Sequence, residues 1–287
     1  MSDRIGVMKT YKLWIGGGFP RSESGRVMEA AGVGGAVEYV ARASRKDLRD
    51  AVSAARGAVG GWGGRTAYNR SQILYRAAEM LEGRAGELAS ALGGGLDAEV
   101  EVGACVDRLV AMAGWCDKLG VVLGSQNPVA GPFHSFTFAE PVGVVGVVAP
   151  DEPGLLGLVS MMAGPLCGGN AVVALAGARR PVAAAVFAEV LATSDVPAGV
   201  VNVLTGDREE LAGEFASHRD IDALHVAGLG EGLTRSVREA SADSLKRVVV
   251  SDDRAVGSGS GWGAGFESPW AVEPFVEMKT LWHPRAV

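Results

Sequence analysis

One apolar run constrains the fold of this chain more than any other feature. It reads Glu-Pro-Val-Gly-Val-Val-Gly-Val-Val-Ala-Pro and occupies positions 140–150. A short β-branched run bounded by turn residues is typical of a parallel strand that is buried on both faces. Open α/β sheets bind their ligands in the turns that follow such strands. The turn from Pro150 to Gly154 is therefore the first place to look for a functional site.

Similar apolar runs recur along the second half of the chain, with helical patterns between them. This alternation predicts a parallel sheet with right-handed crossovers. We expect strands at 142–148, 171–175, 200–204, 223–227 and 246–250, and helices at 154–167, 181–192, 207–217 and 230–243.

The first half of the chain has a different pattern, dominated by helical periodicity. Ser44 with Asp47 resembles a capping box, which predicts the start of a helix with Leu48, Val52 and Ala55 on one face. The other predicted elements are a strand and turn at 11–19, helices at 67–92 and 98–119, and a connector at 127–132.

The predicted fold class is α/β: a Rossmann-like parallel sheet with an N-terminal helical layer and a C-terminal β arm. We expect a strand and helical region over 1–135 and the parallel sheet over 136–250. The glycine- and serine-rich stretch 251–268 is typical of a flexible linker. The arm is expected over 269–287, because Phe275 to Trp282 shows strand-like alternation.

Composition excludes several classes of function. A net charge of −6 provides no basic excess for nucleic acid or an anionic membrane. No run of 18 apolar residues is present, and no metal-ligand spacing occurs, so we expect no membrane span and no metal. An odd number of cysteines without a CxxC motif predicts a reducing compartment, and hence a cytoplasmic location. Those cysteines, expected to be buried and structural, are Cys105, Cys116 and Cys167.

Other polar residues near the strand ends are expected to be structural. His225 lies in a predicted strand, where a hydrogen-bonded structural histidine is the favoured interpretation over a titrating one. Arg179 and Arg180 precede a predicted helix, which favours solvated charges over a phosphate site. The turn at 228–232 is rich in glycine and opens a helix, but as a phosphate-binding motif it is weak.

Several separated motifs, taken in order, resemble the aldehyde dehydrogenase superfamily. They are Glu-Pro-Val-Gly-Val-Val at 140–145, Gly-Gly-Asn-Ala-Val-Val at 168–173, Val-Pro-Ala-Gly-Val-Val-Asn-Val-Leu-Thr-Gly at 196–206, Ser-His-Arg-Asp-Ile-Asp at 217–222 and Lys-Thr-Leu-Trp at 279–282. The match covers about residues 10 to 250 and the tail. It implies a cofactor domain, a catalytic domain inserted into it, and a bridging strand arm.

The resemblance also implies that the catalytic domain is missing. The thiol nucleophile of the family lies well beyond the strand that corresponds to 246–250, and here the predicted linker 251–268 occupies that region. No cysteine of this chain stands at the nucleophile position. The general-base glutamate expected soon after that strand has no clear counterpart in 250–253. We therefore expect no catalytic residues.

The cofactor positions implied by the resemblance carry unsuitable residues. Glu152 stands where the family has an asparagine that stabilises an oxyanion, and a carboxylate would repel that charge. Leu175 replaces a lysine that binds the adenosine ribose, and Leu229 replaces a serine that meets the pyrophosphate. The vestigial cofactor site implied in this way consists of Pro150, Asp151, Glu152, Leu175, Gly206, Gly228 and Leu229.

Three functions remain open at this point. The leading hypothesis is a non-catalytic structural or regulatory subunit, which is either a homodimer or the partner of a full-length aldehyde dehydrogenase through an arm at 275–282. The alternative for the tail is that it folds back on its own chain. The second hypothesis is an NAD(P)-dependent aldehyde oxidoreductase with unusual residues, and the third is a nucleotide or metabolite sensor. We expect no cofactor, and NAD or NADP if one binds.

Overall fold

The computed structural model describes residues 8–32, 37–251 and 265–285. Its central sheet is parallel and has the strand order β10-β9-β6-β7-β8. The strands are β6 (Val144–Val148), β7 (Ala171–Leu175), β8 (Val201–Leu204), β9 (Ala223–Ala227) and β10 (Arg247–Ser251). The predicted strands and the α/β fold class are confirmed.

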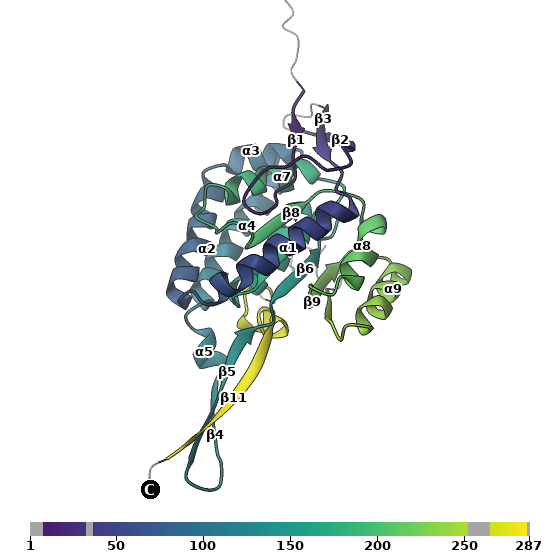
Figure 1. Ribbon diagram of the computed structural model, residues 1–287. Helices are drawn as coiled ribbons and strands as arrows, with labels where there is room; N and C mark the ends of the chain where they lie inside the picture. Colours follow the sequence, from purple (N-terminus) through teal and green to yellow (C-terminus); the bar gives the residue numbers. More distant parts are fainter. Residues whose placement is uncertain (1–7, 33–36, 252–264, 286–287) are drawn as a thin grey trace, which may run out of the picture.

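Helices cover both faces of this sheet, which explains its nearly continuous apolar strands. The predicted crossover helices are confirmed as α6 (Gly154–Cys167), α7 (Pro181–Leu191), α8 (Arg208–Ser217) and α9 (Glu231–Ala242). One face packs on α6, α7 and the N-terminal helices behind them. The other packs on α8, α9 and the long helix α1 (Arg45–Gly63), which crosses the front of the sheet in Figure 1.

The helix α1 begins where the sequence predicts. The Ser44 side chain accepts a hydrogen bond from the Asp47 N–H, and the Asp47 carboxylate accepts one from the Ser44 N–H. A small sheet of order β1-β3-β2 precedes it, made of β1 (Thr10–Tyr11), β2 (Val27–Ala31) and β3 (Val37–Ala41). Of the strand and turn predicted over 11–19, the strand ends at Tyr11, since Trp14 and Ile15 form only isolated bridges, and the turn is present at residues 16–17.

The helical layer is more broken than its periodicity predicts. The expected helix at 67–92 is two helices, α2 (Ala67–Glu82) and α3 (Ala85–Ala91), because Gly83 caps the first and the chain turns at Arg84. Glycine favours such an end over a helix interior. The expected helix at 98–119 is α4 (Leu96–Trp115), followed after a turn by the short α5 (Leu119–Val122).

A β ribbon projects away from this body (Figure 1). Its strand order is β11-β5-β4, with β4 (Ser125–Asn127), β5 (Phe133–Pro141) and β11 (Val276–Pro284), all antiparallel. The predicted connector at 127–132 is the loop between β4 and β5, two strands that we did not predict. The predicted tail strand is confirmed, and within this chain it pairs with β5 along its whole length, as the alternative had it.

Most of the predicted linker, residues 252–264, lies outside the described residues. Ser251 still belongs to β10, and residues 265–268 form a turn that leads into the short 3-10 helices η2 (Pro269–Ala271) and η3 (Glu273–Phe275). This segment packs closely on α6, since a Cβ added to Gly164 would lie 2.7 Å from the Ala271 carbonyl oxygen. Phe275 is fully buried at the base of the ribbon.

Candidate functional site

The order of the strands locates the place where a ligand would enter. From β6 the chain proceeds outward through β7 and β8, and then returns to the other side of β6 with β9 and β10. β6 and β9 therefore flank a topological switch point, where open α/β sheets bind ligands beyond the carboxyl ends of the strands. Pro150 follows β6 and Gly228 follows β9, so these two predicted site residues meet at that point.

Pro150 closes the space between the two strand ends. Gly228 has a φ of +67°, and a Cβ there would lie 3.1 Å from the Pro150 Cα. Gly177, beyond the end of β7, approaches the Pro150 carbonyl so closely that a side chain has no room. The turn after β6 is therefore packed against its neighbours on both sides.

An ion pair lies over the same strand ends. Arg208, the first residue of α8, donates from Nη1 to the Ala149 carbonyl at 3.1 Å and from Nη2 to the Asp151 carboxylate. The other Asp151 oxygen accepts the Ala178 N–H at 2.7 Å. The Arg208 side chain is only 15% exposed. The positive charge nearest the switch point is thus bound within the chain.

The N-terminus of α6, the first helix after the switch point, is also occupied. Its N-cap residue Pro153 provides no side-chain cap. Instead Glu101 of α4 accepts the N–H groups of Leu155 and Leu156 at 2.8 and 3.0 Å. Burial raises the pKa of Glu101, although these two hydrogen bonds oppose the shift. A helix N-terminus is a natural phosphate site, and here the chain's own carboxylate fills it.

Three other predicted site residues lie at or just beyond the carboxyl ends of β7, β8 and β9. Leu175 is fully buried in the core between the sheet and α1. Gly206 packs against α8, where a Cβ would lie 3.2 Å from a Leu211 methyl carbon. Leu229 is half-buried, and its carbonyl accepts a hydrogen bond from the Thr234 hydroxyl at 3.0 Å. The proposed cofactor role of these positions stays a prediction.

Of the two arginines before α7, Arg179 is a solvated charge as expected, and Arg180 is not. Arg179 forms an ion pair with Glu152 at 3.1 Å on the surface. Arg180 is half-buried and covers two glycines. A Cβ added to Gly93 would lie 3.2 Å from the Arg180 guanidinium group, and a Cβ added to Gly154 would lie 3.2 Å from the Arg180 Cβ. Arg180 is therefore a packing residue between α6 and the end of the helical layer.

His225 is structural, as expected. Pro165 has no N–H, so the Met161 carbonyl lacks its usual partner within α6. The His225 Nδ1 lies 3.2 Å from that carbonyl, which requires the proton on Nδ1. Nε2 then accepts from the Ser251 hydroxyl at 2.9 Å. Burial lowers the pKa of His225 to about 4, so the imidazole is neutral at pH 7.

The cysteines are buried and free, as expected for structural residues. Burial raises the pKa of the Cys105 thiol well above its ordinary value, which suppresses the thiolate needed of a nucleophile. Among residues 8–32, 37–251 and 265–285, no group of three or more His, Cys, Asp or Glu side chains is arranged to hold a metal ion.

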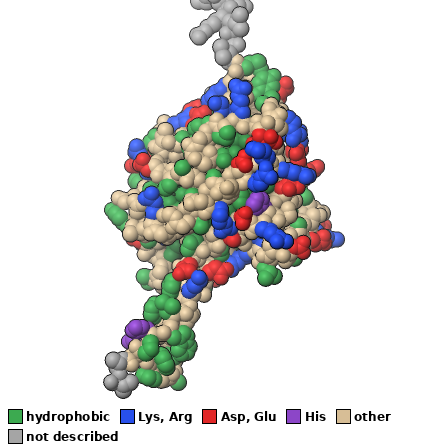
Figure 2. Space-filling model, in the orientation of Figure 1, with side chains coloured by type: hydrophobic (Ala, Val, Ile, Leu, Met, Phe, Trp, Pro, Cys, Tyr) green, Lys and Arg blue, Asp and Glu red, His purple; other side chains and the backbone are tan. Residues whose placement is uncertain are grey.

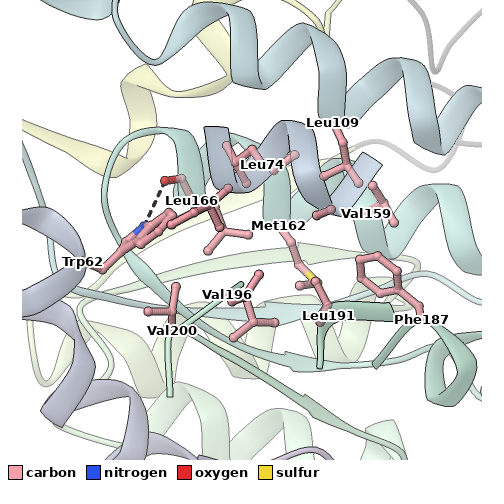
Figure 3. A pocket seen from close by; sticks show the side chains of 14 residues that line it. Trp62, Leu74, Leu109, Val159, Met162, Leu166, Phe187, Leu191, Val196 and Val200 are labelled. Atoms are coloured by element: carbon pink, nitrogen blue, oxygen red, sulfur yellow. Dashed lines mark hydrogen bonds between the residues drawn. The ribbon is translucent and has the colours of Figure 1, made fainter. Parts of the chain in front are cut away.

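Figure 3 shows a hollow in the core between α2, α4, α6 and α7. Its lining is apolar and includes Leu74, Leu109, Val159, Met162 and Phe187, while the Trp62 indole N–H is already bonded to the Leu166 carbonyl at 3.1 Å. The cavity volume of about 10 Å³ is the space of about one water molecule. A packing gap of this size accommodates no substrate.

The residues on the β6 side of the switch point oppose the binding of a dinucleotide. Pro150 fills the space beside Gly228, Arg208 is paired with Asp151, and Glu101 places a negative charge where a phosphate would bind. Sequence reasoning missed Arg208 and Glu101. The position of Arg208 at the first turn of α8, beside the strand ends, is a signal that could have pointed to it. Glu101 lies in a separate helical layer and has no such signal.

No helix in the described part of the chain is both long enough and apolar enough to cross a membrane.

A family model described as "Aldehyde dehydrogenase family" matches residues 21–251. The chain is 32% identical over 258 residues to human cytosolic 10-formyltetrahydrofolate dehydrogenase, covering 85% of this chain and 28% of that protein. It is 30% identical to the putative aldehyde dehydrogenase DhaS of Bacillus subtilis, covering 84% and 50% respectively.

Solved structures agree with these relatives. The NAD+ complex of an aldehyde dehydrogenase from Bacillus cereus superposes with a TM-score of 0.77 at 28% identity, covering 85% of this chain and 51% of that one. PnpE from Pseudomonas sp. WBC-3 gives a TM-score of 0.78 at 26% identity, covering 84% and 50%. The chain thus spans about half the length of these solved structures, and half or less of the curated relatives.

Proposed function

This chain belongs to the aldehyde dehydrogenase family, and from that membership we propose that it acts as a non-catalytic subunit that binds another aldehyde dehydrogenase chain. The observation that carries the proposal is the closed switch point. Asp151 with Arg208, and Glu101 on the N-terminus of α6, bind within the chain the polar groups on the β6 side of the switch point, where a dinucleotide could otherwise make contacts. Without a cofactor, the hydride transfer of aldehyde oxidation has no acceptor.

The segment after the family match supports the same proposal. β10 ends at Ser251 and β11 begins at Val276. The residues between them, 252–275, are fewer than the roughly 40 that a domain needs to fold without a staple. No catalytic domain is therefore inserted at this point of the chain, and none of the three buried thiols replaces its nucleophile.

The partner is expected to bind the β ribbon. β11 has a strand neighbour on one side only among the described residues, so its other edge offers free backbone groups. Exposed apolar side chains accompany that edge, with Leu281 at 50% and Trp282 at 59% exposure. Figure 2 shows hydrophobic side chains gathered on the projecting ribbon. An edge of this kind binds a partner by adding a strand, which requires no active site.

A pull-down from the native organism tests the proposal. The tagged chain is purified under reducing conditions and the bound proteins are identified by mass spectrometry. We expect a full-length aldehyde dehydrogenase in stoichiometric amount, and no turnover of aldehydes by the tagged chain alone. If no such partner is recovered, the measured mass of the purified chain decides between a homodimer, which retains the ribbon interface, and a monomer, which contradicts the proposal.

Titration with NAD and NADP separates this function from the two others. We expect no heat of binding and no thermal stabilisation at millimolar concentration. Binding accompanied by aldehyde oxidation would establish an oxidoreductase. Binding that raises the unfolding temperature without turnover would establish a sensor, since a ligand that binds only the folded state stabilises it.

The proposed location is the cytoplasm. It is supported by the three thiols, which are free in the structure and would stay reduced there.

A further inference from the structure

Two of the buried thiols lie next to each other where two helices end. Cys116 directly follows α4, and Cys167 is the last residue of α6. Their Sγ atoms are 3.6 Å apart, within the distance of a thiol–thiol hydrogen bond. Both residues are at most 2% exposed. Cys105, about three turns earlier in α4, is equally buried but forms no hydrogen bond in the described part of the chain.

The two helices hold this pair in place because they run side by side in the same direction. Near their beginnings, Glu101 of α4 binds the N–H groups of Leu155 and Leu156 in α6. At their ends, Cys116 meets Cys167. Contacts at both ends fix the relative position of the helices, so the 3.6 Å separation follows from the packing of two complete elements.

The geometry is close to that of a disulfide. An S–S bond measures about 2.05 Å, so the two Sγ atoms must approach by about 1.5 Å. Rotation about the Cα–Cβ bonds supplies movements of this size.

A cation lies beside the pair. Arg70 of α2 donates from Nη1 to the Arg65 carbonyl at 2.7 Å, and its guanidinium carbon lies 3.7 Å from the position of a Cβ added to Gly169. The hydrogen bond with Cys167 lowers the pKa of Cys116, with burial opposing and the Arg70 charge assisting, while the pKa of Cys167 is raised. The neighbouring thiol and the Arg70 charge both favour a thiolate within this pair.

We propose that Cys116 and Cys167 are a redox modification site, at which hydrogen peroxide forms an intramolecular disulfide. The Cys116 thiolate attacks one peroxide oxygen, the O–O bond breaks, and hydroxide leaves, giving a sulfenic acid. The Cys167 sulfur then attacks the sulfenic sulfur and loses its proton, and the sulfenic oxygen leaves as water. In sum two thiols and one peroxide give one disulfide and two water molecules. A thiol reductant reverses the reaction.

This modification goes beyond the proposed subunit role and stands without it. The loop closed by the bond contains α5, the ribbon strands β4 and β5, the central sheet strand β6 and nearly all of α6. A cross-link that closes a loop restricts the unfolded chain and stabilises the fold. The oxidised protein is therefore expected to be more stable to unfolding, including the segment that joins the ribbon to the body.

The test uses the whole chain. Reduced protein is treated with excess hydrogen peroxide, the peroxide is removed with catalase, and the protein is denatured in guanidinium chloride at neutral pH with N-ethylmaleimide before digestion and mass spectrometry. We expect a peptide pair joined through Cys116 and Cys167, lighter by two hydrogen atoms than the reduced pair, while Cys105 is alkylated. The oxidised protein should unfold at a higher temperature, and dithiothreitol should remove both the link and the shift.

Matched variants make the result specific. Cys105→Ser should keep the cross-link and the thermal shift, whereas Cys167→Ser should abolish both and leave Cys116 alkylated or oxidised alone. The proposal is overturned if wild-type Cys116 and Cys167 both remain alkylated after prolonged treatment with peroxide. It is equally overturned if the disulfide joins Cys105 or joins two chains. If a variant fails to fold, the measurement on the wild-type protein alone still tests the proposal.

Discussion

At the scale of single residues, the buried amide of Asn170 joins three segments that are distant in the sequence. It accepts the Gly143 N–H at 2.9 Å and donates to the carbonyls of Pro165 and Phe275 at 3.0 and 2.9 Å. We expect Asn170→Ala to lower the free energy of unfolding by about 2 to 4 kcal/mol, because each buried backbone group left unsatisfied costs about 1 to 3 kcal/mol. Urea unfolding measures the change. Asn69→Ala on the surface of α2 is the control and should cost less than about 0.5 kcal/mol.

His225 makes the stability depend on pH. Its folded pKa of about 4 lies below the ordinary value of 6.5, so between these values the unfolded chain binds a proton that the folded chain does not. Stability contributed by the neutral ring is therefore present above pH 6.5 and is lost as the pH falls toward 4. The loss over that window is about 3 kcal/mol.

Comparison with His225→Gln isolates this contribution, since glutamine does not titrate. Urea unfolding of both proteins at pH 7 and pH 4.5 gives two changes in stability. The wild type should lose more than the variant does on acidification. Equal losses would show that the histidine is not the group responsible.

At the scale of elements, α1 depends on its capping box. The Asp47 carboxylate is buried and accepts hydrogen bonds from the Ser22 hydroxyl, the Glu23 N–H and the Ser44 N–H, so the cap also secures the preceding loop. Ser44→Ala should reduce the free energy of unfolding by about 1 kcal/mol, the usual cost of a lost N-cap. Thermal or urea unfolding checks this value. Ser71→Ala, inside α2, should change stability by less than about 0.5 kcal/mol, because alanine suits a helix interior.

At the scale of the whole molecule, the ribbon projects from the body and exposes hydrophobic side chains to solvent. Leu281 lies directly opposite Phe136 in the β11–β5 register, and the two are 50% and 42% exposed. Leu281→Glu should weaken association at least tenfold, because it places a charge where a partner would bury an apolar side chain. Light scattering after gel filtration, or recovery of the partner in the pull-down, measures the effect.

The control for this variant is Leu96→Glu, at a leucine of α4 that is 74% exposed and distant from the ribbon in the sequence. It should leave the assembly unchanged. If both variants dissociate the assembly equally, or neither does, the ribbon is not the interface. Circular dichroism of each variant separates lost association from lost folding.

The sequence by itself determined the elements whose signals are local. Strands such as Ala171–Leu175, the crossover helices and the cap at Ser44 are each specified by the periodicity and turn residues within one segment. The parallel sheet follows from their alternation. Local sequence signals were weaker in the ribbon, where we did not predict β4 and β5. They were also weaker at Gly83, where the single helix predicted over 67–92 is divided into α2 and α3.

Only the tertiary structure decided whether the switch point is open. The contacts of Glu101 with Leu155 and of Arg208 with Asp151 join residues 54 and 57 positions apart. The pairing of β11 with β5 and the approach of Cys116 to Cys167 are likewise long-range. No local pattern predicts such contacts, because they depend on how separate helices and strands pack after each has formed. The predicted turn at Pro150 is in place, and residues from elsewhere in the chain pack against it.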